Sequence, residues 1–283
     1  MTLQDALNAS TIAQHEARLL LSHVTGLNFT DIIINANQPL DEPYKGAFFA
    51  AVDRRKAREP LQYILGEWEF MGLTIKTDSR ALIPRPETEL LVEEALTYIR
   101  KLGRPARVLD VCTGSGCIGV AIAKLADATV TAIDISGEAL ALATENTALH
   151  GLTDKIRFIQ GDLLSCLKKR APQGDSLNNL ENQTFDIIIS NPPYIPTNDL
   201  HSLQQELSHE PKTALDGGAD GMDLYRRLIP QSLGFLAPGG ILLLEIGPPA
   251  VEAIMRDTGY GIVRLIKDYA GYPRVLVGAT NRN

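Results

Sequence analysis

The chain has 283 residues, of which 45% are hydrophobic and 22% charged, and its formal net charge at pH 7 is −7. This length predicts one large domain together with a smaller one, rather than a single domain. An acidic chain does not have the composition of a protein that binds nucleic acid through a basic surface. The two short basic runs, at residues 54–58 and 168–170, are expected to lie on solvated helix faces.

The chain shows neither the apolar core of a signal peptide nor an apolar run as long as a membrane span. Its three cysteines, Cys112, Cys117 and Cys166, are too few for a disulfide framework in a chain of this length. We therefore expect a cytoplasmic protein with reduced thiols and no association with a membrane.

Residues 1–60 are expected to form a small helical domain. Apolar residues recur at helical spacing from Ala17 to Val24, and Gly26 is positioned to end that helix. The sequence Asp41-Glu42-Pro43 is typical of the start of a further helix. The segment carries no nucleophile, metal cluster or phosphate-binding loop, so we predict that it recognises a partner.

Residues 61–80 are expected to form a β-hairpin that joins the two domains. Aromatic and β-branched residues from Leu61 to Ile75 are interrupted by Gly66 and Gly72, which is a hairpin pattern. A helix from Glu87 to Leu102 is expected to follow.

Residues 81–283 alternate short β-branched runs with helical stretches, which predicts an α/β domain with an open, doubly wound sheet of the Rossmann-like type. Residues 171–184 are polar and rich in turn formers, and they are expected to form a surface loop. The predicted strands are Val108–Val111, Thr129–Ile133, Ile156–Ile159, Phe185–Ile189, Ile241–Ile246, Ile262–Ile266 and Val275–Val277.

The first strand is followed by a loop of small residues, in the sequence Asp110-Val111-Cys112-Thr113-Gly114-Ser115-Gly116, with a helix expected to begin near Cys117. Glycines allow the backbone to approach a ligand closely, and a helix N-terminus offers free N–H groups. Gly114, Gly116 and Gly119 also fit the spacing G-x-G-x-x-G. Dinucleotide sites share this spacing, so the loop by itself does not decide which nucleoside is bound.

Acidic residues follow the next two strands. Asp134 is placed to accept hydrogen bonds from the hydroxyls of a ribose, and it or Ser136 could also cap the following helix. In Gly161-Asp162-Leu163, Asp162 could accept from the amino group of an adenine and Leu163 could cover one face of the ring. An ordinary turn explains that last segment equally well.

The sequence Asn191-Pro192-Pro193-Tyr194 directly follows a predicted strand. Two prolines stiffen the loop and remove two backbone donors. Asn191 contributes an acceptor oxygen and Tyr194 an aromatic face. Because ligands bind outside the carboxyl ends of strands in open α/β sheets, this motif indicates a site for a planar –NH2 group.

Together, the glycine loop, Asp134 and the Asn-Pro-Pro-Tyr motif resemble those of class I methyltransferases that act on amide or exocyclic nitrogen. More narrowly, the chain resembles the HemK/PrmC family of release factor glutamine methyltransferases over nearly its whole length. The segment Pro84-Arg85-Pro86-Glu87-Thr88-Glu89 is similar to that of the release factor enzymes rather than that of their ribosomal-protein relatives. Cys112 departs from the family pattern, which usually has glycine at this position.

The resemblance implies transfer of a methyl group from S-adenosylmethionine, without a metal, to the glutamine of the Gly-Gly-Gln motif in class I peptide chain release factors. Catalysis would rest on positioning and electrostatics, through Asn191, Pro192 and Tyr194, with Pro193 also contacting the substrate. The residues expected to hold the cofactor are Cys112, Thr113, Gly114, Ser115, Gly116, Asp134, Asp162, Leu163 and Asn191.

Four other functions are compatible with parts of the sequence. A ribosomal-protein glutamine methyltransferase is the nearest of them. An adenine-N6 methyltransferase could use the same motif on a flipped base, but the acidic charge argues against direct nucleic-acid binding. An NAD-dependent oxidoreductase would leave Asn191 and Tyr194 unexplained, and a binding module without activity would leave the intact glycine loop and Asp134 unexplained.

Overall fold

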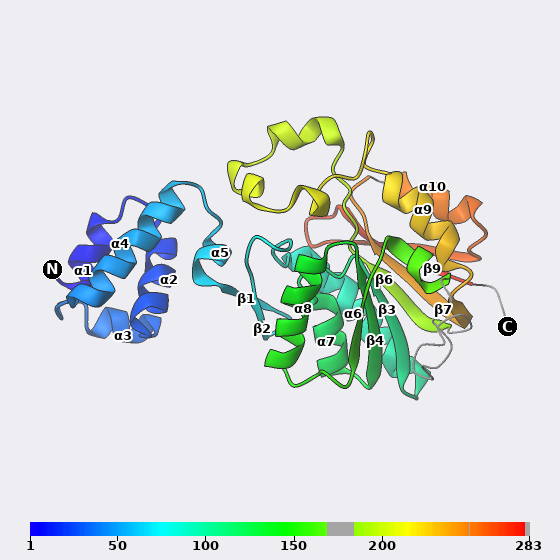
Figure 1. Ribbon diagram of the computed structural model, residues 1–283, viewed down its shortest axis with the longest axis horizontal. Helices are drawn as coiled ribbons and strands as arrows, with labels where there is room; N and C mark the ends of the chain where they lie inside the picture. The colour runs from blue at the N-terminus through cyan, green and yellow to red at the C-terminus, as the bar shows by residue number, and fades with distance from the viewer. Residues whose placement is uncertain (169–183, 249, 281–283) are drawn as a thin grey trace. The chain divides into compact units, whose positions relative to one another are not determined.

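The chain is divided into two compact units (Figure 1). Unit 1 contains Met1–Trp68 together with Gln204–His209, and unit 2 contains the segments from Glu69 to Leu203 and from Glu210 onward. The computed structural model describes residues 1–168, 184–248 and 250–280. The surface loop predicted at residues 171–184 therefore lies outside the described residues, apart from Thr184.

Unit 1 is built from helices, as predicted. Gly26 ends its second helix with a φ of 72°, in the left-handed region that glycine adopts without strain. Leu20, Leu21 and Phe48 are fully buried in the core of the unit. The helices are α1 (Leu3–Ala9), α2 (Gln14–Thr25), α3 (Phe29–Ile34), α4 (Glu42–Lys56) and α5 (Leu61–Leu65).

The predicted hairpin over residues 61–80 is wrong in its first part. Its strands are only β1 (Glu67–Phe70) and β2 (Leu73–Lys76), and residues 61–65 form α5 instead. Leu61 and Ile64 lie one helical turn apart and are both buried, so the apolar run serves one face of a helix. Short apolar runs fit strand and helix alike, which explains the error.

An ion-pair cluster holds the segment η3 (Gln205–His209) in unit 1, although it lies far along the chain. Arg55 donates from Nε to Glu16 at 3.0 Å and from Nη1 to Glu206 at 3.1 Å, and Arg58 also donates to Glu206, at 3.2 Å. The Arg55 side chain is only 15% exposed. Charge pairs of this kind stabilise more than exposed pairs do, because solvent screens them less.

Unit 2 contains a sheet with the strand order β5-β4-β3-β6-β7-β9-β8. The first five strands in this order pair in parallel, and β9 runs antiparallel to both of its neighbours. The predicted open α/β sheet is therefore confirmed. The strands are β3 (Ala106–Val111), β4 (Ala128–Asp134), β5 (Ile156–Gln160), β6 (Phe185–Ser190), β7 (Leu236–Glu245), β8 (Ile262–Lys267) and β9 (Pro273–Ala279).

Helices cover both faces of this sheet, which confirms the doubly wound arrangement (Figure 1). Helices α6 (Pro86–Leu102) and α7 (Cys117–Leu125) pack on the face that carries Val108, and α8 (Gly137–Leu149) lies beside α7. Helices α9 (Asp223–Ser232) and α10 (Val251–Asp257) pack on the face that carries Leu109. Within the described ranges, none of the helices has the length and apolar character needed to cross a membrane.

The carboxyl ends of β3, β4 and β6 lie side by side. Val111 at the end of β3 is paired with Ile133 in β4 and with Ser190 in β6. The loops that follow these three strands therefore leave the sheet at one edge. Asp134 is the last residue of β4, and the glycine loop and Asn191 directly follow β3 and β6.

Gly116 caps the start of α7 in a constrained backbone position. Its φ is 79°, and a Cβ placed on it would lie 2.9 Å from the Cβ of Ala143 in α8. Two requirements therefore select glycine here: a left-handed backbone and the close approach of two helices. Gly151 has a similar φ of 67°, but a Cβ there would meet no atom within 4 Å.

We expect Gly116→Ala to lower the free energy of unfolding by more than Gly151→Ala does. Both variants incur the left-handed strain of about 1 kcal/mol, and Gly116→Ala adds an overpacking cost of roughly 1–3 kcal/mol. Urea unfolding of the two variants measures the difference. Equal losses would mean that α8 moves away from Gly116 without cost.

Candidate active site

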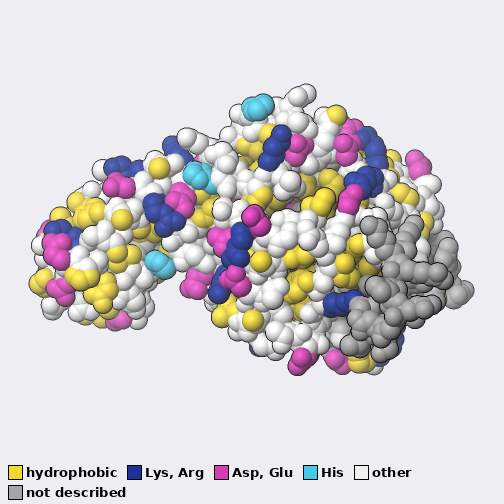
Figure 2. All heavy atoms as spheres, in the orientation of Figure 1, with side chains coloured by type: hydrophobic (Ala, Val, Ile, Leu, Met, Phe, Trp, Pro, Cys, Tyr) yellow, Lys and Arg dark blue, Asp and Glu magenta, His cyan; other side chains and the backbone are white. Residues whose placement is uncertain are grey.

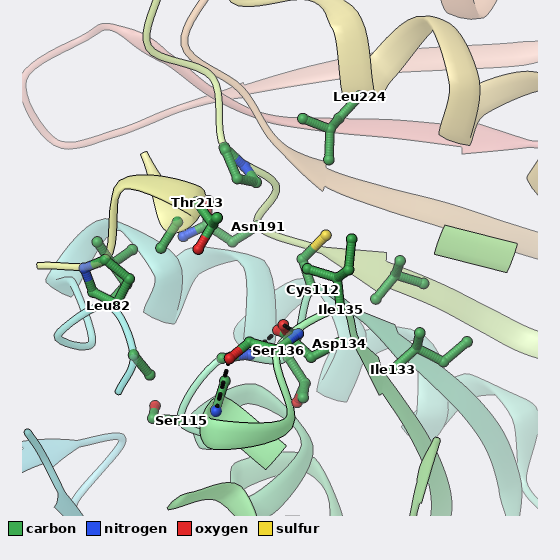
Figure 3. Close-up of a pocket in the computed structure, with 18 of the residues that line it drawn as sticks. Leu82, Cys112, Ser115, Ile133, Asp134, Ile135, Ser136, Asn191, Thr213 and Leu224 are labelled. Atoms are coloured by element: carbon green, nitrogen blue, oxygen red, sulfur yellow. Dashed lines mark hydrogen bonds between the residues drawn. The ribbon is translucent and has the colours of Figure 1, made fainter. Parts of the chain in front are cut away.

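A pocket of about 540 Å³ lies at the edge where the parallel strands end (Figure 3). Its volume is within the range of small-molecule sites in proteins. In Figure 3, Leu82, Thr213 and Asn191 line one side, and Asp134, Ile135 and Ser136 line another. The predicted site residues that line it are Cys112, Thr113, Gly114, Ser115, Asp134, Asp162, Leu163, Asn191 and Pro193.

Asp110 fixes the glycine loop from beneath. Its Oδ2 accepts hydrogen bonds from the Thr113 hydroxyl at 2.6 Å and from the Gly119 amide at 3.2 Å. The residue is completely buried, and burial raises the pKa of its carboxyl to about 7, although the two hydrogen bonds act in the opposite direction. Asp110 thus ties the end of β3 to the first turn of α7.

Asp134 is presented to the pocket by the backbone. Its Oδ2 accepts from the Gly114 amide and its Oδ1 from the Ser136 amide, both at 2.9 Å. Each carboxylate oxygen can accept a further hydrogen bond. Burial raises the pKa of Asp134, and the bonds from these amides oppose that shift. Ser136, rather than Asp134, caps α8 by accepting from the Ala139 amide, so Asp134 keeps capacity for a ligand.

A polar and an apolar side chain lie next to each other at this end of the pocket. Ile135 follows the acid, lines the pocket and is 60% exposed, which is unusual for a large apolar side chain next to a core strand. A carboxylate that can accept further hydrogen bonds therefore lies beside an apolar side chain. The sequence singled out Asp134 as a site residue and did not single out Ile135, and both line the pocket.

Cys112 adopts a φ of 60°, in the left-handed region. This is a conformation in which glycine is unstrained and a side chain is not, in keeping with the glycine that the resembling family has there. Burial and the charge of Asp134 raise the pKa of the Cys112 thiol. The thiol is therefore protonated and lines the pocket as a small apolar surface.

Asp162 forms an ion pair at the pocket wall. Its Oδ2 accepts from Nη2 of Arg227 in α9 at 2.5 Å, and the side chains of both residues are about half exposed. Arg227 could not be predicted from the sequence, because a single arginine on a helix has no distinguishing pattern. Leu163 lies beside the pair, buried and with a φ of 49°.

The Asn-Pro-Pro-Tyr motif follows β6 and is divided by the structure. Asn191 and Pro193 line the pocket, whereas Pro192 and Tyr194 do not belong to its lining, and nor does Gly116. The Tyr194 hydroxyl donates to Glu245 at 3.4 Å. The Tyr194 ring packs against Gly247 so closely that a Cβ on this glycine would lie 2.5 Å from the nearest ring carbon.

The turn Asp216–Gly221 braces this motif from behind. The Ile195 amide donates to Leu215, and the Gly217 amide donates back to Ile195 at 2.8 Å. A Cβ on Gly217 would lie 2.7 Å from Cα of Tyr194, so only glycine fits. The density of glycines in this turn was a signal that the sequence interpretation did not use.

A second segment, residues 82–85, also lines the pocket and was not predicted to do so. The buried carboxylate of Glu210 holds it, accepting from the Ile83 amide at 3.0 Å and pairing with the Arg85 guanidinium. Residues 211–214, which directly follow Glu210, line the pocket as well. The two segments are thereby tied together at the site.

Charged side chains of both signs lie on the face that Figure 2 shows. Figure 2 shows Lys and Arg side chains interspersed with Asp and Glu on the visible face. In the part of the chain that the structure describes, no three His, Cys, Asp or Glu side chains are grouped so that they could hold a metal ion.

Two family models match the chain: a PrmC N-terminal domain over residues 2–66 and a methyltransferase domain over residues 103–245. A release factor glutamine methyltransferase of Geobacter sulfurreducens is 42% identical over 271 residues, which are 94% of this chain and 89% of the relative. The enzyme of the same name from Deinococcus radiodurans is 41% identical over 249 residues, or 87% of this chain and 84% of the relative.

Among solved structures, the fold is similar to that of the T. thermophilus 16S rRNA N2 G1207 methyltransferase in complex with AdoMet and guanosine. The TM-score is 0.53 at 17% identity, over 76% of this chain and 50% of that chain. At this identity the similarity extends to the fold alone.

We expect Asp110→Asn to gain stability relative to the wild type as the pH rises from 5 to 8. The Asp110 carboxyl has a pKa of about 7 in the folded chain against an ordinary value of 3.8. Between these values the unfolded chain loses this proton and the folded chain keeps it, so the wild type is destabilised as the pH rises. The variant lacks this titration. Urea unfolding at both pH values provides the measurement, and a pH-independent difference would contradict the assignment.

Proposed function

The chain belongs to the family of release factor glutamine methyltransferases, and we propose that it methylates the side-chain amide nitrogen of the glutamine in the Gly-Gly-Gln motif of a class I release factor. S-adenosylmethionine is the methyl donor in this proposal. The observation that carries it is the single pocket lined by the glycine loop and Asp134 on one side and by Asn191 on another.

The nucleoside part of the cofactor is assigned to the end of the pocket around Asp134. The free lone pairs of this carboxylate would accept from the ribose hydroxyls, and Ile135 would cover the base. Asp162 is assigned to the amino group of the base, through the oxygen that Arg227 does not occupy. When bound, S-adenosylmethionine supplies a methyl group on a positively charged sulfur.

The substrate amide is assigned to Asn191. An amide nitrogen is a weak nucleophile because its lone pair is delocalised, so it must be held in one orientation. The Asn191 Oδ1 would accept one hydrogen of the substrate –NH2 group. Pro192 and Tyr194, to which the sequence also assigned a substrate contact, are outside the pocket lining. The gain in rate would come from positioning and preorganised electrostatics, and the proton would leave to water.

Two alternatives from the sequence are less well supported. Methylation of adenine in nucleic acid would require a positively charged surface that attracts phosphates. The net charge of −7 has the same sign as the phosphates and would repel them. Methylation of a ribosomal protein would involve the same chemistry at Asn191. The relatives that match over most of this chain carry the name of release factor enzymes, and this favours the release factor.

Recognition of the protein substrate is assigned to unit 1, which contains the helical domain predicted at residues 1–60. Its family model is separate from that of the methyltransferase domain, and its described residues do not line the pocket. A short peptide would occupy only the pocket, whereas an intact release factor could also contact unit 1.

The test is mass spectrometry after incubation of the protein and S-adenosylmethionine with a purified class I release factor or with a Gly-Gly-Gln peptide. We expect one added methyl group, about 14 Da, on the glutamine of the intact factor and a much lower kcat/KM for the peptide. Absence of methylation on both would overturn the proposed activity. Equal kcat/KM values would instead remove unit 1 from substrate recognition.

We expect Asn191→Ala to impair methyl transfer and Asp134→Ala to impair cofactor binding. Loss of a preorganised polar contact costs on the order of 10²–10³ in rate, so Asn191→Ala should slow single-turnover methylation by this factor while it leaves S-adenosylhomocysteine binding nearly unchanged. Asp134→Ala should weaken that binding, by about 1.5–3 kcal/mol for hydrogen bonds to a charged acceptor.

Calorimetry with S-adenosylhomocysteine and single-turnover assays at saturating cofactor measure the two quantities. Asn191→Asp is the sharper variant, because it keeps the shape and adds a negative charge near a cationic cofactor. Attraction that fades toward the transition state lowers turnover. We therefore expect slower transfer together with tighter binding of S-adenosylmethionine, but not of S-adenosylhomocysteine, whose sulfur is uncharged. Wild-type transfer by Asn191→Ala would refute the assigned contact.

A further inference from the structure

A chain of hydrogen bonds connects the Asn191 amide to a buried carboxylate through Thr88, which also lines the pocket. The Asn191 Nδ2 donates to Oγ1 of Thr88, in the first turn of α6, at 3.2 Å. The Thr88 hydroxyl donates to Oε2 of Glu245, at the end of β7, at 2.6 Å. The other oxygen of Glu245 accepts from the Tyr194 hydroxyl at 3.4 Å. Three segments that are distant in sequence thus meet at one amide.

The direction of these bonds determines which end of the Asn191 amide faces the pocket. The two ends of an amide have nearly the same shape, and only their hydrogen bonds distinguish them. Thr88 has one hydroxyl proton, and it is given to Glu245. Its oxygen can then only accept from Asn191, which requires the –NH2 end of that side chain. The Oδ1 end is left without a hydrogen bond to any described residue.

The hydrogen-bond chain ends in buried residues, and burial of polar groups has a desolvation cost. Thr88 is 2% exposed and Glu245 is 1% exposed. Burial raises the pKa of Glu245, against the hydrogen bond from Thr88 and the nearby charge of Arg274. A buried carboxylate held by two hydroxyl groups contributes little to stability compared with well-packed apolar residues.

We propose that Thr88 and Glu245 are positioning residues that set the polarity of the Asn191 amide, so that an acceptor rather than a donor faces the substrate. The enzyme would thereby accept an –NH2 group and reject a carbonyl or carboxylate oxygen in the same place. This inference rests on the proposed function of Asn191. In this proposal Tyr194 is the second hydroxyl donor to Glu245. This role does not require Tyr194 to line the pocket.

Thr88→Val tests the proposal, because valine keeps the shape of threonine and removes the hydroxyl. Without that acceptor the Asn191 amide can turn over, and misplaced catalytic groups cost up to about 100-fold in rate. We expect kcat for methylation of an intact release factor to fall by about 10- to 100-fold. KM and the affinity for S-adenosylhomocysteine should stay within about twofold of the wild type, which also shows that the variant is folded.

Three further variants separate positioning from a merely structural role. Thr88→Ser restores the hydroxyl and should recover most of the lost rate. Glu245→Gln lets residue 245 donate to Thr88, which can reverse the direction of the chain, and should lower kcat although the shape is kept. Thr97→Val, on the same helix and outside the pocket lining, is the matched control and should behave as the wild type.

The Asn191→Ala background supplies the last comparison. Since Thr88 acts only through Asn191 in this proposal, adding Thr88→Val to Asn191→Ala should lower the rate no further. If the wild type methylates the release factor and Thr88→Val retains its full kcat, the inference is overturned. A Thr88→Ser variant that is as slow as Thr88→Val would also overturn it. A wild type without methylation would instead refute the proposed function itself. If Thr88→Val does not bind cofactor, the kcat of Glu245→Gln decides, and a wild-type value overturns the proposal.

Discussion

The parallel register of β3 with its two neighbours is the constraint on which the site depends. Val111 is paired with Ile133 on one side and with Ser190 on the other, so three chain segments leave the sheet at the same level. Asp134 and Asn191 each follow their paired residue by one position. A shift of one residue in either pairing would turn each side chain to the opposite face and separate the acid from the amide.

This constraint explains how much the sequence could predict. Strands of a parallel sheet are buried on both faces and appear as β-branched runs, and polar residues directly after them stand out. The glycine loop, Asp134 and Asn191 were found in this way. The hairpin was predicted too early because Leu61 and Ile64 suit a strand as well as a helix. That ambiguity is local, and only packing resolves it.

Other parts of the site have no local pattern in the sequence. Arg227 lies on a helix among other charged residues, Glu210 follows a turn-rich segment, and Thr88 is one polar residue in an amphipathic helix. Their importance comes from partners that are from 65 to more than 120 residues distant along the chain. Such contacts depend on the completed tertiary structure, so propensity and periodicity carry no information about them.

The segment Gln204–His209 has a consequence for limited proteolysis. The chain passes from unit 1 to unit 2 after Trp68, returns after Leu203 and leaves again after His209. A single protease cut after Trp68 would remove one of three covalent connections, and the fragment before the cut would still be paired with Glu206 through Arg55 and Arg58. A fragment that begins after the cut would carry six residues of the other unit, with the Glu206 carboxylate stripped of both arginines. The two units are therefore compact, but neither unit can be separated from the other by a single cut in the chain.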